Sequence, residues 1–215
     1  MMKSSSEYRA MARESLSGVW NESALAYLII LAVACIFSVS SVVAPQEILW
    51  LQGSLSGVQV AVSLLLIVPL TYGFDNAMLS LARRENSAPA NDMFDYFKRD
   101  YSRSVPTLLL AALAEVGLGI ITLFIGTFIL QYAYAMVPYL LRDYPELTAT
   151  EALRTSREMM KGHKWDLFVL DLTFIGWGIL CLFTAGIGLL WLQPYVSAAH
   201  AHFYEDLKAE TIVEE

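Results

Sequence analysis

Charged residues are scarce in this chain. Only 16% of its 215 residues are Asp, Glu, Lys or Arg, whereas 56% are hydrophobic. Soluble domains carry roughly 25% charged residues, so the composition argues against an ordinary soluble protein. The surplus apolar surface needs a lipid environment, and the sequence predicts an all-α, polytopic membrane protein.

Several kinds of chemistry are also missing. The two cysteines, Cys35 and Cys181, lie in apolar stretches without metal-ligand spacing, so we expect neither a disulfide nor a zinc site. The net charge of −7 comes without an unopposed basic face, which argues against nucleic acid as a partner. No metalloprotease motif or phosphate-binding loop occurs, and Leu55 stands where a nucleophile elbow needs serine. The sequence therefore predicts no enzyme activity, no metal and no cofactor.

Long apolar runs are plentiful, and they separate the fourteen Lys and Arg residues into four short stretches. A helix needs about 20 apolar residues to cross the hydrocarbon core. Folding the runs as three hairpins puts every basic stretch on one side, as the positive-inside rule requires, with both termini in the cytoplasm. The six predicted spans are residues 24–44, 57–74, 105–125, 127–141, 165–183 and 189–204.

The apolar stretch from Val105 to Leu141 is too long for one span and short for two. A single tilted helix would carry the next basic stretch, Arg142 to Lys164, to the outside, whereas two helices keep it inside. We therefore expect a hinge at Gly126. Because the fourth span is short, it either crosses the bilayer fully or packs against its neighbours without crossing.

A short polar segment with helical periodicity precedes each hairpin. Ser4 with Glu7, and Thr148 with Glu151, have the spacing of a capping box, and the middle segment carries an apolar stripe. Such helices either lie on the membrane surface, apolar side down, or pack on protein as connectors. The single membrane domain, 1–215, thus divides into hairpin units 1–82, 91–141 and 148–206, followed by an acidic tail, 207–215.

The first and third units echo each other. An Arg-Glu pair, a glycine and a tryptophan recur in the same order in residues 13–20 and 157–165, with a one-residue shift at the tryptophan. We interpret this echo as an internal duplication in parallel orientation.

Prolines and glycines in the spans predict where helices break and where they approach each other. Each return span contains one proline, Pro69, Pro138 or Pro194, at which we expect a break. Gly176 and Gly178 are expected at a close contact between helices.

Two polar residues, Glu115 and Gln131, lie deep in predicted spans. A charge near the bilayer centre costs about 2.5 to 3.5 kcal/mol, so we expect Glu115 to face the bundle and to meet Gln131, Tyr132 or Tyr134. This contact either serves a proton or cation site or fixes helix packing through a hydrogen bond, and we favour the packing interpretation.

Asp171 and His200 are expected at matching depths in neighbouring antiparallel spans. An Asp–His contact could shuttle a proton, because imidazole titrates near neutrality. A clamp between two helices explains the same pairing, and we favour it. His202 follows about 200° further around the helix, so it cannot share one metal ion with His200.

Glycines and aromatic residues recur through the last third of the chain. They comprise Gly162, His163, Lys164 and Trp165, then Phe174, Gly176 and Trp177, then Pro194 and Tyr195, and finally Phe203 and Tyr204. This signature resembles that of the bacterial integral membrane family known as domain of unknown function 975 (DUF975), and weaker matches extend over nearly the whole chain. One departure is Ile125 before Gly126, where proline is expected. The resemblance implies a multi-pass protein of the bacterial cytoplasmic membrane and no known activity, cofactor or substrate.

These features are compatible with functions of different classes. We expect a non-enzymatic membrane scaffold or accessory subunit, with the lipid bilayer, another membrane or cytoplasmic protein, or a second copy of the chain as partner. The alternative is a small-solute or ion transporter or channel that uses Glu115 and the proline-broken helices. An intramembrane enzyme, which would depend on Asp171 or His200, is the function that we expect least.

Overall fold

The computed structural model describes residues 2–43, 63–85, 88–121 and 125–214, and its regular elements are all helices. They are α1 (Ser5–Ser15), α2 (Trp20–Val43), a π-helical turn η1 (Ser63–Ile67), α4 (Val68–Ala82), α5 (Pro89–Ile121), α6 (Ile125–Tyr134), α7 (Val137–Asp143), α8 (Ala149–Met159), α9 (Lys164–Phe183) and α10 (Leu189–Glu214). The predicted all-α class is therefore confirmed for the described residues.

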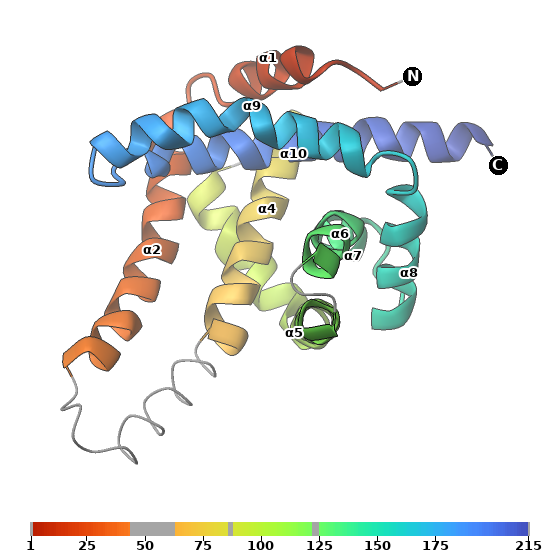
Figure 1. The fold of residues 1–215 in the computed structure, drawn as a ribbon. Helices are drawn as coiled ribbons and strands as arrows, with labels where there is room; N and C mark the ends of the chain where they lie inside the picture. Colours follow the sequence, from red (N-terminus) through yellow and green to blue (C-terminus); the bar gives the residue numbers. More distant parts are fainter. Residues whose placement is uncertain (1, 44–62, 86–87, 122–124, 215) are drawn as a thin grey trace.

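The helices form two groups that run in different directions (Figure 1). Helices α9 and α10 lie side by side across the molecule with α1 along them, whereas α2 and α4 descend from this layer. The chain bends by 97° between α1 and α2. Helix α10 packs against α1, α2, α4 and α9, which makes it the central element of the bundle.

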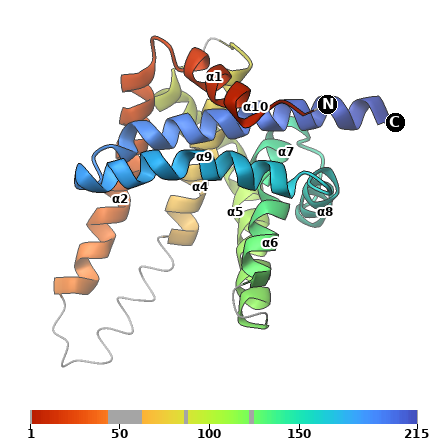
Figure 2. The same cartoon turned by 45° about the horizontal axis from the view of Figure 1, so that its top comes forward.

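Both ends of the chain lie on the same side of the molecule (Figure 2). Lys3, ahead of α1, forms an ion pair with Asp206 of α10. Tyr8 of α1 packs its ring against Phe203 of α10, with ring centroids 5.4 Å apart, and both side chains are fully buried. These contacts fix α1 along the second half of α10.

The core is centred on α4 and α10. The side chains of Tyr72, Phe74 and Met78 on α4 are fully buried, as are Phe203 and Tyr204 on α10. Ala198, Ala199 and Ala201 are also completely buried. Small side chains of this kind let neighbouring backbones approach α10 closely.

Helices α1 and α8 have the same construction. Each has 11 residues and begins with the predicted capping box, in which the backbone amide of Ser4 or Thr148 donates to the carboxylate of Glu7 or Glu151. Three residues after each helix stands a glycine with positive φ, 89° at Gly18 and 97° at Gly162. The next helix begins two residues later, at Trp20 or Lys164. This correspondence agrees with the echo between the two segments, and the tryptophan is the first residue of α2 but the second residue of α9.

The middle unit differs from its prediction. The expected short helix before the third span is wrong, because the polar segment from Asn91 and the apolar segment form one helix, α5, with Pro106 inside it. No residue with turn geometry separates the two segments, and proline removes only one backbone hydrogen bond from a helix. The following stretch contains two helices that pack against each other, α5 up to Ile121 and α6 from Ile125, but the expected hinge residue Gly126 lies inside α6, and residues 122–124 lie outside the described residues.

The three prolines of the return spans behave differently. Pro69 and Pro138 each lie in the first turn of a helix, where the missing amide would have had no partner. The chain changes direction or helix type just before each of them. The break expected at Pro194 is wrong, because α10 continues through this residue to Glu214, so the acidic tail is largely helical.

Among the described residues, two helical segments are long and apolar enough to cross a membrane, Leu65–Ala82 and Lys164–Phe183. A third candidate arises if α1 and α2, as far as Ile36, are counted as one bent span. The second predicted span, 57–74, begins outside the described residues, and its helix runs past Phe74 to Ala82.

Candidate functional site

A short polar contact between two apolar helices joins Asp171 of α9 to His200 of α10. The Nε2 atom of His200 lies 2.6 Å from Asp171 Oδ1, so the contact that their matching depths predict is confirmed. Tyr132 of α6 donates its hydroxyl to the other oxygen of Asp171, at 3.0 Å. One carboxylate thus connects three helices, and we call this set the Asp171 triad.

Aromatic packing positions the triad. Phe168 lies three residues before Asp171, on the same face of α9, and its ring meets that of Tyr132 edge-on at a centroid distance of 5.9 Å. The side chains of Asp171 and His200 are 31% and 25% exposed. The triad is therefore partly covered, and its carboxylate remains close to the molecular surface.

A second polar contact, which the sequence did not single out, lies one turn earlier on α10. Ser197 donates its hydroxyl to Asp75 Oδ1 of α4 at 3.1 Å, and His200 lies within electrostatic range of Asp75. Asp75 was missed because the predicted second span ended at Phe74, whereas α4 continues to Ala82. A lone carboxylate inside the apolar run of α4 was the available signal.

The contact between His200 and Asp171 can hold a proton between the imidazole and the carboxylate. A neutral imidazole donates from one ring nitrogen and accepts at the other, so the tautomer of His200 determines whether Nε2 donates to Asp171. The arrangement can act as a clamp between α6, α9 and α10, or it can pass a proton from Tyr132 or Asp171 toward Asp75. Both roles use the same atoms.

The expected contacts of Glu115 stay a prediction, because the side chain of Glu115 lies outside the described residues. Gln131 is exposed on α6. Of the other two expected partners, Tyr132 donates to Asp171, and Tyr134 accepts a hydrogen bond from Arg157 at 2.7 Å.

His202 has a different partner from His200. Its Nε2 lies 2.8 Å from the hydroxyl oxygen of Ser15 in α1, on the opposite side of α10 from Asp171. Among the described residues there is no group of three or more His, Cys, Asp or Glu side chains arranged to hold a metal ion.

An ion-pair cluster around Asp143, at the end of α7, was not found from the sequence. The Asp143 carboxylate accepts from Arg83 Nη1 at 2.7 Å, from Lys208 Nζ at 2.6 Å and from the Tyr204 hydroxyl at 2.9 Å. Burial raises the pKa of Asp143, but these hydrogen bonds lower it by more, to about 2. Arg83 also donates through Nε to Glu205 at 2.8 Å. The cluster joins α4, α7 and α10 and remains charged at neutral pH.

The signature residues divide between the core and the surface. Phe174 and Tyr195 meet edge-on at 5.0 Å, and Tyr204 stacks on Tyr139 at 5.1 Å, so these aromatic residues hold α10 against its neighbours. Other members of the signature are exposed or precede α9. Trp165 and Trp177 are 68% and 54% exposed, Gly176 has nothing within 4 Å of a Cβ position, His163 contacts Asp166, and Lys164 begins α9.

Comparisons with known proteins identify one family. No curated protein and no solved structure matches the chain. The model of the family described as "Protein of unknown function (DUF975)" matches it twice, over residues 1–125 and 107–211. These two matches together cover nearly the whole sequence, and the chain therefore belongs to the DUF975 family, as its signature residues predict.

Proposed function

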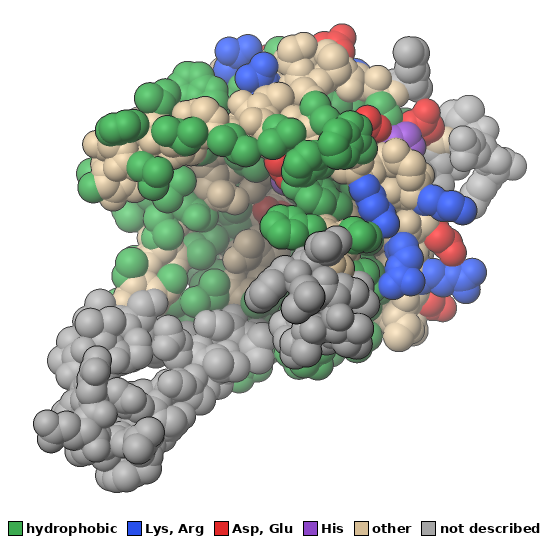
Figure 3. Space-filling model, viewed as in Figure 1, with side chains coloured by type: hydrophobic (Ala, Val, Ile, Leu, Met, Phe, Trp, Pro, Cys, Tyr) green, Lys and Arg blue, Asp and Glu red, His purple; other side chains and the backbone are tan. Residues whose placement is uncertain are grey.

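We propose that this chain is a multi-pass protein of the bacterial cytoplasmic membrane and acts as a non-enzymatic scaffold or accessory subunit. The observation that carries the proposal is the outer face of α9. Ile175, Ile179, Leu182 and Phe183 are each more than half exposed, and Figure 3 shows apolar side chains gathered along this part of the molecule. Lipid or another protein normally covers a continuous apolar helix face.

The glycines of α9 support the same proposal. A Cβ atom added to Gly176 or Gly178 would meet nothing within 4 Å, so these residues do not serve the close contact within the chain that we expected. Small residues on an apolar helix favour association with another helix in the membrane. This face of α9 is therefore suited to a partner helix from a second protein or a second copy of the chain.

The polar side chains inside the bundle support a structural role. Asp143 is saturated by hydrogen bonds from Arg83, Lys208 and Tyr204, and Asp171 is shared between two partners. Such contacts hold helices together. A scaffold needs this stability and an uncovered binding face.

Hydropathy and the positive-inside rule support six crossings with both termini in the cytoplasm. The position of the third hairpin supports a different layout. Six straight crossings would put Trp20 and the turn from Thr184 to Gly188 on opposite faces, about 30 Å apart. In the structure Trp20, Thr184 and Gly188 line one cavity. We therefore propose that α2 and α4 enter the bilayer and that the tip of the α9–α10 hairpin stays near the cytoplasmic face.

A photo-crosslinking amino acid at Ile179 tests the scaffold role in intact cells. We expect Ile179 to crosslink to one defined protein, or to a second copy of the chain, whereas the exposed polar position Thr150 on α8 gives no such product. Crosslinks from Ile179 to lipid alone would contradict a scaffold role. Extraction of membranes at high pH tests the location, since an integral protein stays in the membrane fraction.

A transporter or channel is the second candidate, and the chain of polar groups from Tyr132 through Asp171 and His200 toward Asp75 favours it. Replacement of Asp171 by Asn, and of Glu115 by Gln, separates the two functions. A scaffold keeps its copurifying partner in both variants and shows no change in solute or proton flux. A transporter loses flux in one or both variants.

A further inference from the structure

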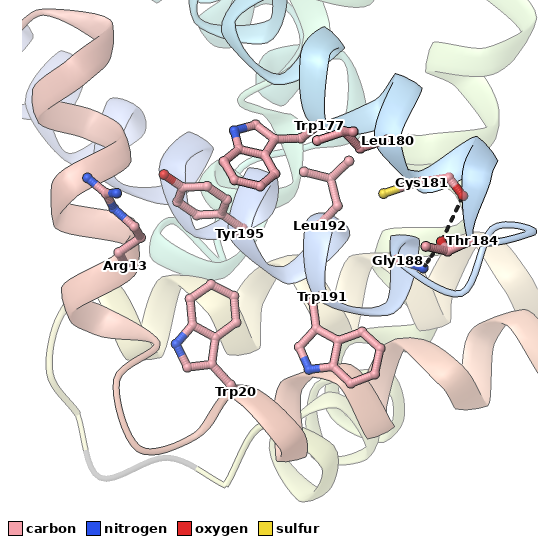
Figure 4. Close-up of a pocket in the computed structure, with 10 residues that line it drawn as sticks. All are labelled: Arg13, Trp20, Trp177, Leu180, Cys181, Thr184, Gly188, Trp191, Leu192 and Tyr195. Atoms are coloured by element: carbon pink, nitrogen blue, oxygen red, sulfur yellow. Dashed lines mark hydrogen bonds between the residues drawn. The ribbon is translucent and has the colours of Figure 1, made fainter.

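A cavity of about 380 Å³ lies between the end of α1, the start of α2 and the tip of the α9–α10 hairpin. Figure 4 shows its lining residues: three tryptophans and a tyrosine surround the space, apolar side chains cover one end, and Arg13 stands at the other. Two of its lining residues, Trp177 and Tyr195, belong to the sequence signature, and none of the polar contacts between helices described above lies in this cavity.

The aromatic walls of the cavity are fixed in part by packing. Trp20 and Tyr195 meet edge-on with ring centroids 6.0 Å apart, and Tyr195 is held from behind by Phe174 at 5.0 Å. Trp177 and Trp191 are 54% and 42% exposed. Tryptophan is favoured where hydrocarbon meets the polar headgroups, because one end of the ring is apolar and the other can donate a hydrogen bond.

The mouth of the cavity carries positive charge without an acidic partner. Arg13 is exposed and forms no ion pair or hydrogen bond with the described residues. Arg9, one turn earlier on α1, has a buried Nε atom without a hydrogen-bond partner among them. Both guanidinium groups lie within electrostatic range of Tyr195, whose hydroxyl end is turned toward Arg13 in Figure 4. The adjacent carboxylate, Glu14, is engaged by Arg84 at 2.6 Å.

We propose that this cavity binds an anionic phospholipid of the inner leaflet, with one acyl chain between the indole rings and the phosphate against Arg13, where Arg9 adds positive charge from one turn away. The volume lies at the lower end of the range for small-molecule pockets, about 300 to 1,000 Å³, which suits one chain better than a whole lipid. An aromatic box alone could also hold a quaternary ammonium group. Arg13 at the mouth, with Arg9 one turn away on α1, disfavours that ligand and favours a phosphate.

This inference rests on the membrane location proposed above and does not depend on the scaffold role. The full chain is reconstituted in vesicles of phosphatidylcholine with increasing fractions of phosphatidylglycerol brominated on its acyl chains. In the comparison, the phosphatidylcholine carries the bromine and the phosphatidylglycerol does not. Bromine quenches a tryptophan only at close range. Replacement of Trp50 and Trp165 by Phe leaves three tryptophans, all of which line the cavity.

We expect the anionic lipid to quench these tryptophans preferentially, with an apparent affinity about fivefold higher than that of phosphatidylcholine. Arg13→Gln should remove most of this preference, and Arg13→Lys should retain it, because the lysine keeps the charge. Arg154→Gln is the matched control: Arg154 is an exposed arginine on α8, away from the cavity, and its loss should leave the preference unchanged.

The outcomes separate the two proposals. Equal quenching by both lipids, or a preference that survives in Arg13→Gln, would overturn the lipid site and leave the membrane location intact. Absence of quenching by either lipid would overturn both. Inorganic phosphate added at millimolar concentration should not relieve the quenching; relief would show that the site takes a free anion, which contradicts a lipid ligand.

Discussion

Gly73 of α4 lies directly against the backbone of Met93 in α5. A Cβ atom added at Gly73 would stand 2.3 Å from the Met93 carbonyl oxygen, far inside the distance that real Cβ atoms tolerate. Because the obstacle is backbone in a buried contact, it cannot move aside as a flexible side chain would. This position therefore sets how closely α4 and α5 pack.

Gly73→Ala should destabilise the protein by about 1 to 3 kcal/mol, the usual cost of overpacking. The measurement is the apparent melting temperature of the purified protein in detergent. Gly176→Ala is the control, since its Cβ would point into open space, and a helical Gly→Ala change there should be neutral or slightly stabilising. Equal melting temperatures for wild type and Gly73→Ala would show that α4 and α5 are not in close contact.

The Asp143 cluster predicts a particular pH dependence. The pKa of Asp143 is about 2 in the folded protein and 3.8 in its ordinary state, so its contribution to stability is present above pH 3.8 and is lost as the pH falls toward 2. We expect the melting temperature of the wild type to drop across this window. Asp143→Asn should melt lower at pH 6 and should change less on acidification.

An exposed carboxylate provides the comparison for that experiment. Glu151 caps α8 and is solvent-exposed, so Glu151→Gln should leave most of the acid transition in place. If the melting temperature of Asp143→Asn fell on acidification as much as that of the wild type, other carboxylates would be the cause of the transition.

The contact between Asp171 and His200 should appear as an energetic coupling between α9 and α10. In a double-mutant cycle of Asp171→Ala and His200→Ala we expect a coupling of roughly 0.6 to 1.7 kcal/mol, as for other polar pairs between membrane helices. Unfolding in mixed detergent gives the stabilities. The pair Asp171→Ala and His202→Ala should be additive, because His202 binds Ser15 on the other side of α10. A coupling near zero for the first pair would contradict the contact.

The tip of the α9–α10 hairpin offers a direct test of topology. Ala185 is exposed, and the turn that contains it lies beside Trp20. In a chain with both native cysteines replaced by serine, Ala185→Cys should react with a membrane-impermeant maleimide only after the cytoplasmic face is opened. Reaction in intact cells would place the tip outside and would support six crossings. Lys161→Cys, in a predicted cytoplasmic loop, is the internal reference.

Local rules were sufficient for much of the helical framework. The capping boxes at Ser4 and Thr148 and the limits of α9 follow from short-range chemistry, which the sequence displays directly. The contact between Asp171 and His200 was also predictable, because equal depth in adjacent helices leaves two polar side chains few other partners.

Long-range packing accounts for what the sequence did not show. Asp143 meets Arg83 and Lys208 only because α4, α7 and α10 converge, and no spacing in the sequence encodes that meeting. Pro194 was expected to break a helix, but α10 is packed on several sides and stays continuous. Gly176 was expected at a close contact between helices, but it faces away from the bundle. Hydropathy could not distinguish the two faces of α9, because both are apolar.

The matching construction of α1 and α8 constrains how the chain is threaded. If the proposed duplication is real and both copies keep the same orientation, Gly18 and Gly162 lie on the same face of the bilayer. The polypeptide between these glycines can then traverse the lipid only an even number of times. Under this duplication the number of crossings between the two glycines can differ only by pairs, and an odd number would mean that one copy had inverted during evolution.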